Sequence, residues 1–460
     1  MRIARRTAGL LSGLVLTFSN AAGATDLLQA WQAAQQNDPE FAAAQSAQEA
    51  GAARRKQADA LWRPSVQLTA AAGRATSETS ATGARFSAPG FGQSDGVSFD
   101  TSVTNGATHR WTLSARQPLL SRERQAQSRQ LALAAETADL EWKHAQQNLM
   151  LRVAERYFDV VMATESLRVL RMQQASVDRA LAEAKDRFQI GDVKVTDTHE
   201  ASARAEAIRA QLLAAEADLQ VKQAALFDLT GLPASSMPLP RPTKDVPAGD
   251  VPALDSVLAQ ARDNNPLVRM QAAGIDVAKE EAAKFSALAS PTIDLVAQLG
   301  RERLSGSGDF GDASNRGNNG MIGVQLTIPL FTGGYRSARH EETLRLADKA
   351  QADASRVRQQ VALQTRATWL NLNVGTGRIA ALTEAWKASL ARLDATRIGS
   401  QVGDRTTQDL LNAENDAANA ELALLQGRIG LLLDRLRLAA LAGQLDESAL
   451  RVVNASLQGN

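Results

Sequence analysis

Four acidic residues surround a lone arginine near the end of the chain, in the stretch VGDRTTQDLLNAEND from Val402 to Asp416. Carboxylates beside an arginine can perform general acid–base catalysis, bind cations or cap the start of a helix. The stretch follows a long helical pattern that Gly403 interrupts, which favours a turn between two helices. Arg405 and Asp409 are therefore the first residues whose role needs an explanation.

The same arrangement occurs earlier in the chain, in the stretch QIGDVKVTD around Gly191. In both stretches an aspartate follows the glycine by six residues, Asp197 in the first and Asp409 in the second. The spacings Thr406-x-x-Asp409 and Asp197-x-x-Glu200 are typical of capping boxes, and acids in a first turn oppose the helix dipole. Capping leaves room for a second role, because a symmetric oligomer would place each of these residues on a ring.

Other groups that could do chemistry are few. The chain has no cysteine, which excludes disulfides, thiolate metal ligands and a lipid-modified N-terminal cysteine. Its four histidines lie far apart in sequence and lack the spacing of a metal site. The stretch LFTGG before Tyr335 lacks the lysine of a phosphate-binding loop. We therefore expect no catalytic residue, no cofactor and no metal, in a protein that is not an enzyme.

Residues 1–24 have the features of a secretory signal peptide. Arg2, Arg5 and Arg6 precede a short apolar run and a cleavage site that ends at Ala24. Without these arginines the formal charge falls from +1 to −2, so the composition does not suggest nucleic-acid binding. No later segment offers the roughly 20 apolar residues of a membrane helix.

Prolines indicate an internal duplication. Six of the 13 prolines lie in one linker, residues 231–252. Pro64 and Pro291 lie in matching stretches 227 residues apart, and Pro118 and Pro329 lie in others 211 residues apart. The economical explanation is two structural repeats and a tail. Their boundaries are 25–230 for the first repeat, 253–445 for the second and 446–460 for the C-terminal tail.

Four segments are predicted as strands of about ten residues, the length of a transmembrane β-strand. They are residues 65–74, 109–117, 292–301 and 321–328. Residues 75–108 are too many and too polar for a compact hairpin, so we expect a loop there. Trp62 and Trp111 lie beside these strands, where they could mark a membrane interface or fill a core. The four paired prolines mark the strand–helix junctions.

Long helices fill most of the remaining chain. Residues 119–190 contain neither glycine nor proline. Apolar residues recur there at steps of four and seven, as on a coiled-coil seam. The first members of this seam are Leu149, Val153, Val160 and Leu167. Another uninterrupted helix is predicted over 195–230, and the second repeat follows the same plan with glycines that loosen it.

The predicted lengths indicate rods. A helix over 38–62, together with the helix over 195–230, nearly equals the helix over 119–190 in length. The second repeat has its own first helix over 266–289. Each repeat then forms a two-helix rod with two strands at one end and a glycine turn at the other. Open sheet edges are not tolerated in a membrane, so strands of several subunits must close into a barrel.

The predicted fold class is mainly α with a small transmembrane β part. Duplicated long-helix rods form a trimeric α-helical barrel joined to a 12-stranded β-barrel, with four strands from each chain. The duplication, the junctions QPLL and IPLFTGG, and the paired turns at Gly191 and Gly403 resemble the TolC family of outer-membrane channel-tunnels. The match covers essentially the whole chain after the signal peptide. Without a cysteine, the chain is nearer to the type I secretion branch than to lipid-anchored efflux members.

The resemblance implies roles for residues of the two turns. Three residues correspond to the polar tethers that close the periplasmic end of the tunnel: Thr196, Asp197 and Arg405. Asp409 corresponds to a member of the acidic ring at the entrance. Two positions depart from the family prototype, because Ser400 replaces a tyrosine of the lock and Asn412 replaces a second acid. We therefore expect a looser tether and a weaker ring.

The resemblance also implies the function and partners. We expect a homotrimeric outer-membrane channel that extends into the periplasm and exports a protein such as a toxin. Its partners would be a periplasmic adaptor, an inner-membrane ABC transporter, the exported protein and membrane lipid, but no nucleic acid. One alternative is small-molecule efflux with an RND or ABC pump. An alternative of another class is a periplasmic coiled-coil scaffold whose strand segments are loops.

Overall fold

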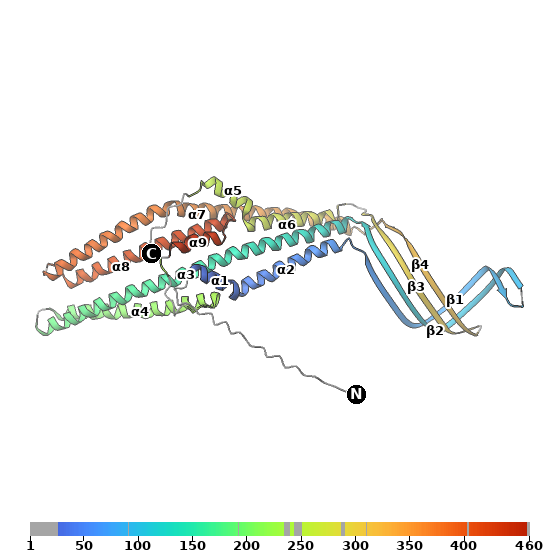
Figure 1. Ribbon diagram of the computed structural model, residues 1–460, viewed down its shortest axis with the longest axis horizontal. Helices are drawn as coiled ribbons and strands as arrows, with labels where there is room; N and C mark the ends of the chain where they lie inside the picture. Colours follow the sequence, from blue (N-terminus) through green and yellow to red (C-terminus); the bar gives the residue numbers. More distant parts are fainter. Residues whose placement is uncertain are drawn as a thin grey trace, which may run out of the picture. The chain divides into compact units, whose positions relative to one another are not determined.

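The structure is a computed structural model in which the chain forms helices and one sheet (Figure 1). It describes residues 26–90, 92–191, 193–233, 240–242, 251–286, 290–309, 311–402 and 404–457. The predicted signal peptide, most of the predicted linker and Gly403 lie outside the described residues. In the described part, the order helix, helix, strand, strand, helix, helix occurs twice, and a last helix follows.

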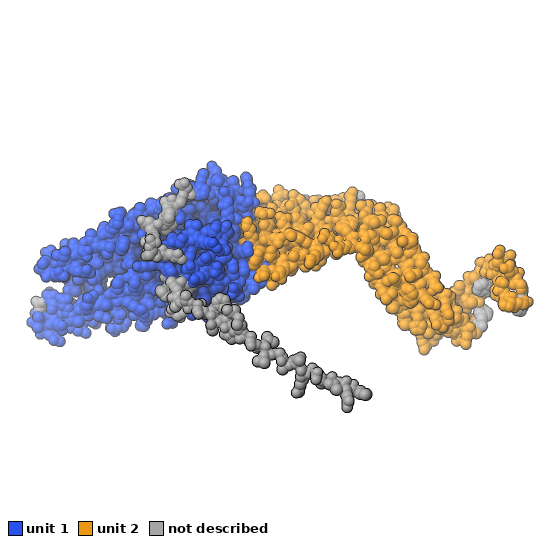
Figure 2. All heavy atoms as spheres, in the orientation of Figure 1, with its two compact units in different colours: residues 1–44, 144–265, 360–460 blue, residues 45–143, 266–359 orange. Residues whose placement is uncertain are grey.

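The chain divides into two compact units (Figure 2). Unit 1 comprises residues 1–44, 144–265 and 360–460, and unit 2 comprises residues 45–143 and 266–359. Each unit therefore draws on both halves of the sequence. A repeat of the sequence and a compact unit of the structure are different divisions of this chain.

The helices repeat in matching lengths. In the first half they are α1 (Leu27–Asn37), α2 (Pro39–Ala60), α3 (Arg122–Gln189) and α4 (Val195–Thr230). In the second half they are α5 (Leu254–Asn264), α6 (Pro266–Ala283), α7 (Tyr335–Gln401) and α8 (Thr407–Leu441). The last helix, α9 (Glu447–Ala455), lies within the segment predicted as a tail. α3 has 68 residues, against 22 in α2 and 36 in α4, close to the predicted proportions.

The helix predicted over 38–62 corresponds to α2, and a separate helix that was not predicted, α1, precedes it. Asp38 has an extended ψ of 116° and separates α1 from α2, which begins at Pro39. A residue before proline is pushed out of the helical region, so the helix must restart there. In the second half Asn265 separates α5 from Pro266 in the same way, with a ψ of 125°. α6 ends at Ala283, and the predicted end at residue 289 lies outside the described residues.

The core of unit 1 follows the predicted seam. Leu149, Val153, Val160 and Leu167 of α3 are all buried. Leu432 and Leu436 of α8 are buried as well. Near the two chain ends, Asn454 of α9 accepts a hydrogen bond from the backbone N–H of Leu27 at 3.0 Å and donates one to Asp26 at 2.9 Å. The two ends of the described chain are thus tied into one unit.

Unit 2 contains one antiparallel sheet in the order β1-β2-β3-β4. The strands are β1 (Ser65–Ala88), β2 (Gly92–Leu120), β3 (Thr292–Gly308) and β4 (Gly311–Thr327). The register pairs Leu68 with Leu113, and Leu113 with Leu299, which joins the two predicted strand pairs through β2 and β3. β1 and β4 are the outer strands, and each has one unpaired edge in the described sheet.

The prediction of a loop over 75–108 is wrong. β1 continues to Ala88 and β2 begins at Gly92, so the segment is a hairpin whose register pairs Thr79 with Thr101. Gly90 and Gly92 supply the left-handed backbone of its turn, with φ angles of +90° and +72°. Polar threonines and serines form strands readily when neighbouring backbones satisfy their hydrogen bonds and neither face must be apolar.

Candidate functional site

The turn between α7 and α8 is held by a reciprocal cap. Thr406 Oγ1 accepts a hydrogen bond from the backbone N–H of Asp409 at 3.1 Å. Asp409 Oδ2 accepts from the backbone N–H of Thr406 at 3.1 Å and from its hydroxyl at 2.8 Å. The predicted capping box is therefore confirmed.

The cap also sets the charge of Asp409. Hydrogen bonds from the backbone and the hydroxyl of Thr406 hold the pKa of Asp409 below its ordinary value of 3.8. The positive charges of Arg405 and Arg392 act in the same direction. Asp409 is half-buried and remains a carboxylate even at weakly acidic pH.

The first turn, between α3 and α4, differs from its prediction. Asp197 does not begin the helix, because α4 already starts at Val195. Instead Asp197 lies in the first turn, where its carboxylate accepts from the backbone N–H of Lys194 at 3.4 Å and from the hydroxyl of Thr196 at 3.3 Å. The pairing of Asp197 with Glu200 as a capping box is therefore wrong. An acidic side chain in the first turn stabilises the exposed N–H groups of the helix start, although Asp197 is not the N-cap residue itself.

Gly191 makes the first turn possible. Its φ of +79° is a left-handed conformation that residues with a side chain adopt rarely. Its N–H donates to the carbonyl of Phe188 at 3.0 Å, which closes the end of α3. The equivalent Gly403 lies outside the described residues.

The aliphatic part of the Arg405 side chain lies against the end of α7. A Cβ atom on Gly399 would come within 2.7 Å of Arg405 Cγ, so the absence of a side chain at Gly399 makes this approach possible. The backbone N–H groups of Asp404 and Arg405 both donate to the carbonyl of Gly399, at 2.8 and 3.2 Å. Among the described residues, the Arg405 guanidinium forms neither an ion pair with Asp197 nor a hydrogen bond with Thr196 of its own chain. Arg405 and Asp197 thus lie on two exposed turns of unit 1, at the ends of α7 and α3 drawn on the left of Figure 1.

Two helices of unit 1 meet just behind these turns. Arg204 of α4 donates to the side-chain oxygen of Asn412 of α8 at 3.0 Å. Ala205 of α4 and Leu411 of α8 belong to one buried cluster with Val177 of α3. Asn412 therefore has a structural partner that sequence reasoning did not find, because a single arginine on a charged helix carries no distinguishing pattern.

The sheet has two chemically different faces. Directly opposite residues on paired strands share a face, and alternate residues along a strand do too. One face carries a continuous apolar band across all four strands. Its members include Val66, Leu68, Leu113, Leu295, Leu299, Ile322, Val324 and Leu326, all of them exposed. The other face carries polar residues at the same levels, such as Gln67, Ser114, Gln298 and Gln325.

The polar face neutralises its own charges. Arg110 pairs with Glu302 at 2.7 Å, and Arg116 pairs with Asp294, whose side chain is 4% exposed. The apolar face, in contrast, exposes large side chains that burial against lipid would stabilise. Trp111 lies on this apolar face and is 40% exposed, so it does not fill the core. Trp62 is half-buried at the α2–β1 junction, where its carbonyl accepts from the Gln117 side chain at 2.7 Å.

The paired prolines lie at or near the strand ends. Pro64 and Pro291 immediately precede β1 and β3, and Pro329 lies between β4 and α7. Pro118 is buried and lies inside β2, two residues before its end, opposite Asp294 of β3. The junction of β2 with α3 is therefore at Ser121, slightly beyond the predicted position.

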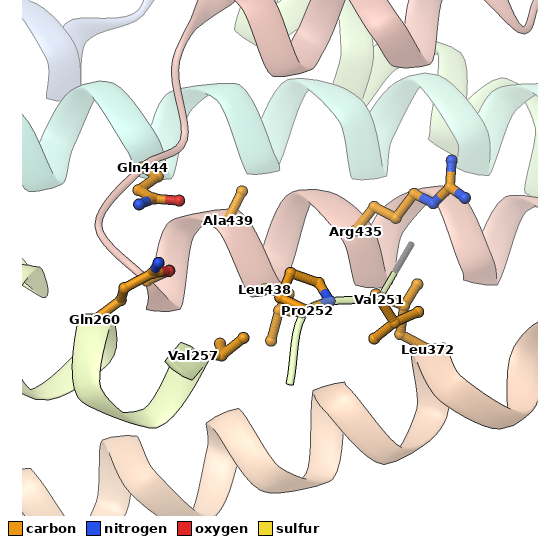
Figure 3. Close-up of a pocket in the computed structure, with 10 residues that line it drawn as sticks. Val251, Pro252, Val257, Gln260, Leu372, Arg435, Leu438, Ala439 and Gln444 are labelled. Carbon is orange, nitrogen blue, oxygen red and sulfur yellow. The ribbon is translucent and has the colours of Figure 1, made fainter. Parts of the chain in front are cut away.

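A cavity of about 260 Å³ lies in unit 1 (Figure 3). Its wall is largely aliphatic, with Val257 of α5, Leu372 of α7 and Leu438 of α8. Arg435 and two glutamines are its polar lining residues, and it contains no nucleophile or carboxylate. Across the described residues, no three His, Cys, Asp or Glu side chains come together as a metal site.

No helix in the described part of the chain is both long enough and apolar enough to cross a bilayer.

Comparison with known proteins agrees with this architecture. Residues 30–232 and 257–444 match the family named Outer membrane efflux protein. The chain is 28% identical over 464 residues to the alkaline protease secretion protein AprF of Pseudomonas aeruginosa, covering 99% of this chain and 92% of that protein. It is 28% identical over 324 residues to outer membrane protein TolC of Vibrio cholerae, covering 70% and 74%.

A solved structure has the same fold. The outer membrane protein VceC of Vibrio cholerae superposes with a TM-score of 0.71 at 19% sequence identity. The match covers 91% of this chain and 96% of that one. The TolC-like fold, with a helical part and a β part, is thus established. The family match and the curated relatives give the location, the cell outer membrane with extension into the periplasm. The chain belongs to the outer membrane efflux protein family.

Proposed function

We propose that three copies of this chain assemble into a trimeric export channel. The observation that carries the proposal is the open four-stranded sheet with one apolar face. Unpaired strand edges in lipid leave backbone groups without partners, which costs several kcal/mol for each group. Pairing β1 of one copy with β4 of the next removes both edges. Three copies of four strands then give a twelve-stranded barrel, and the helices give an α-helical tunnel in the periplasm.

The proposed cargo is a protein secreted by a type I system. The support is the relative AprF, which is named for protease secretion and matches this chain over 99% of its length. The proposed partners are a periplasmic adaptor and an inner-membrane ABC transporter. The finer hypothesis is a toxin cargo of the kind exported by the channel for the Bordetella adenylate cyclase toxin.

Small-molecule efflux is the second candidate function, favoured by the family name, Outer membrane efflux protein. The pump would then be of the RND or ABC type. Deleting the gene distinguishes protein secretion from small-molecule efflux. Loss of one secreted protein with unchanged drug sensitivity supports type I secretion. The reverse pattern supports efflux. The scaffold alternative is wrong in its premise, because the four segments it treats as loops are strands.

The proposed gate is the pair of helix turns. Thr196 and Asp197 on one turn and Arg405 on the other would tether neighbouring chains around the periplasmic opening. Exposed ion pairs contribute at most about 1 kcal/mol each, so three equivalent links hold the closed state by only a few kcal/mol. A partner that binds the open turns more tightly could therefore open the channel.

Arg405→Ser is expected to raise the single-channel conductance of the purified trimer in planar bilayers, because it removes the guanidinium from each proposed tether. Arg397→Ser is the matched control. Arg397 lies on α7, close to the turn that contains Arg405, and the conductance of this control variant should equal that of the unmodified channel. Equal conductance of Arg405→Ser and the unmodified channel would contradict the tether.

Asp409→Ala is expected to weaken block by multivalent cations applied from the periplasmic side, because it removes the proposed carboxylate ring. Thr406→Ala is the control, since it breaks the same cap but leaves the carboxylate. Because the folded pKa of Asp409 is depressed, block of the unmodified channel should persist at pH 4 and weaken as the pH falls further below 3.8. Equal loss of block in both variants would assign the effect to the cap.

A further inference from the structure

Three arginines lie just beyond the apolar band, on the same face of the sheet. Leu299, Arg301 and Arg303 alternate along β3 and therefore share one face. The register places Arg303 directly opposite Arg316 of β4 and, on its other side, opposite His109 of β2. All three arginines are exposed. They form a compact cationic patch, which we call the outer arginine patch.

The patch lies at the end of the band that is farther from the helices. β3 leaves the α6 junction at Thr292, passes the apolar residues Leu295 and Leu299, and only then reaches the patch. Trp111 lies opposite Arg301, between the band and the next row of cations. Tryptophan is enriched where a membrane-spanning surface meets the polar headgroups. The order along the face is thus the apolar band, then a row with Trp111 and Arg301, then the row with Arg303 and Arg316.

In the part of the chain that the structure describes, no counter-charge pairs with the outer arginine patch. In the described residues, Arg301, Arg303 and Arg316 form no ion pair and donate no side-chain hydrogen bond. On the opposite face of the same strands, Arg110 has Glu302 at 2.7 Å. Like charges placed directly opposite each other on paired strands destabilise a sheet. An anion bound between Arg303 and Arg316 would offset this repulsion.

We propose that the outer arginine patch binds the phosphate groups of a multiply acylated, phosphorylated glycolipid of the lipid A class in the outer leaflet. The proposal rests on the proposed function, which turns the apolar face toward lipid. Guanidinium groups bind phosphate through paired hydrogen bonds, and the three side chains offer several such forks close together. The adjacent apolar band provides a surface on which acyl chains can pack. A soluble phosphate has no acyl chains and would leave this band uncovered. A phosphorylated lipid therefore fits both parts of the surface.

The test measures binding of diphosphoryl lipid A to the purified full-length protein in dodecyl maltoside, by native mass spectrometry. The control ligand is the same lipid with both phosphates removed. This comparison uses the unmodified protein and does not depend on the folding of any variant. We expect at least tenfold tighter binding of the phosphorylated form. Equal binding of the two lipids would overturn the proposal, because the patch would then not recognise phosphate.

Variants locate the site. Replacing Arg301, Arg303 and Arg316 together by glutamine is expected to weaken lipid A binding at least tenfold. The control replaces three exposed arginines of α7, with the same loss of charge, and should change binding less than twofold. These control residues are Arg345, Arg356 and Arg358. Arg110→Gln, on the opposite face of β2, should also leave binding unchanged.

Trimer formation and conductance of the patch variant keep the two proposals apart. If the variant forms conducting trimers and loses lipid A binding, the inference is supported. If it forms conducting trimers and binds lipid A like the unmodified protein, the inference is wrong and the channel proposal stands. If the unmodified protein forms no trimer, both proposals fail.

Discussion

Ile322→Arg is expected to prevent stable insertion of the sheet into a bilayer. Ile322 lies on the apolar face opposite Ala297, next to Val324, and its side chain is 77% exposed. A continuous band of such exposed apolar side chains marks a protein or membrane contact, and the channel proposal assigns this band to lipid. An arginine on the lipid face near the bilayer midplane costs about 2–4 kcal/mol, and a symmetric trimer would bear this cost three times. The measurement is urea-dependent folding into phosphatidylcholine vesicles, followed by the heat-modifiable mobility of the trimer.

Met321→Arg is the matched control for Ile322→Arg. Met321 precedes Ile322, is 56% exposed and points to the opposite, polar face, where it pairs with Gln298. An added cation there would face the water-filled interior and should leave folding nearly unchanged. If both variants lose the trimer equally, or if both insert normally, the assignment of the apolar face to lipid is wrong.

Tyr157→Ala is expected to produce the second large effect, a loss of about 3–5 kcal/mol in the free energy of unfolding. Tyr157 is fully buried in unit 1 and contacts Phe158 edge to face, with ring centroids 5.6 Å apart. Its hydroxyl donates to the carbonyl of Pro240 at 3.2 Å, in a described part of the linker. Burial raises the pKa of this hydroxyl, so it remains neutral and able to donate at physiological pH.

Tyr157→Phe separates the ring from the hydroxyl. It keeps the packed ring and removes the hydroxyl together with its bond to Pro240, so the expected loss is about 1 kcal/mol. Both variants can be compared by the helical circular dichroism signal during urea unfolding. Equal losses for the two variants would show that the linker contact, rather than core packing, dominates at this position.

The helices were predictable because their signal is long. The region around Leu149 and Val153 repeats apolar residues over many turns without a glycine, and only a helix buries such a pattern. The second half contains glycines, which we expected to loosen the helices, yet α7 and α8 are continuous. At Gly375 the glycine has a packing reason, since a Cβ atom would come within 2.5 Å of Leu431. A glycine that admits a close neighbour and one that weakens a helix look alike in sequence.

The hairpin of β1 and β2 was missed for a different reason. Alternation marks a strand only where one face is apolar, as in the stretch from Met321 to Leu326. The segment around Thr79 has no apolar face, so its polarity indicated a loop. Its strand character comes from pairing with a partner such as Thr101, which sequence patterns do not reveal.

The candidate site was predictable in part. The spacing of Thr406 and Asp409 identified a reciprocal cap, because that cap depends only on residues close in sequence. The partner of Asn412 was not predictable, since Arg204 lies 208 positions away. The outer arginine patch also joins distant segments, and only the register of β3 with β4 shows that Arg303 and Arg316 are neighbours. The tether and ring roles of the helix turns stay predictions.

Disulfide cross-linking between β1 and β4 tests the central claim, closure of the sheet by neighbouring chains. The chain has no cysteine, so Gln67→Cys on β1 can be combined with a cysteine at Met321, Gly323 or Gln325 on β4, all on the polar face. Within one chain two strands separate β1 from β4, which puts them roughly 14 Å apart and beyond the reach of a disulfide.

The account predicts that at least one of these pairs gives covalent dimers and trimers on a non-reducing gel of outer-membrane fractions, and that the single-cysteine variants give no covalent trimer. Monomers alone at every pairing, in protein that has reached the outer membrane, would contradict closure of β1 on β4.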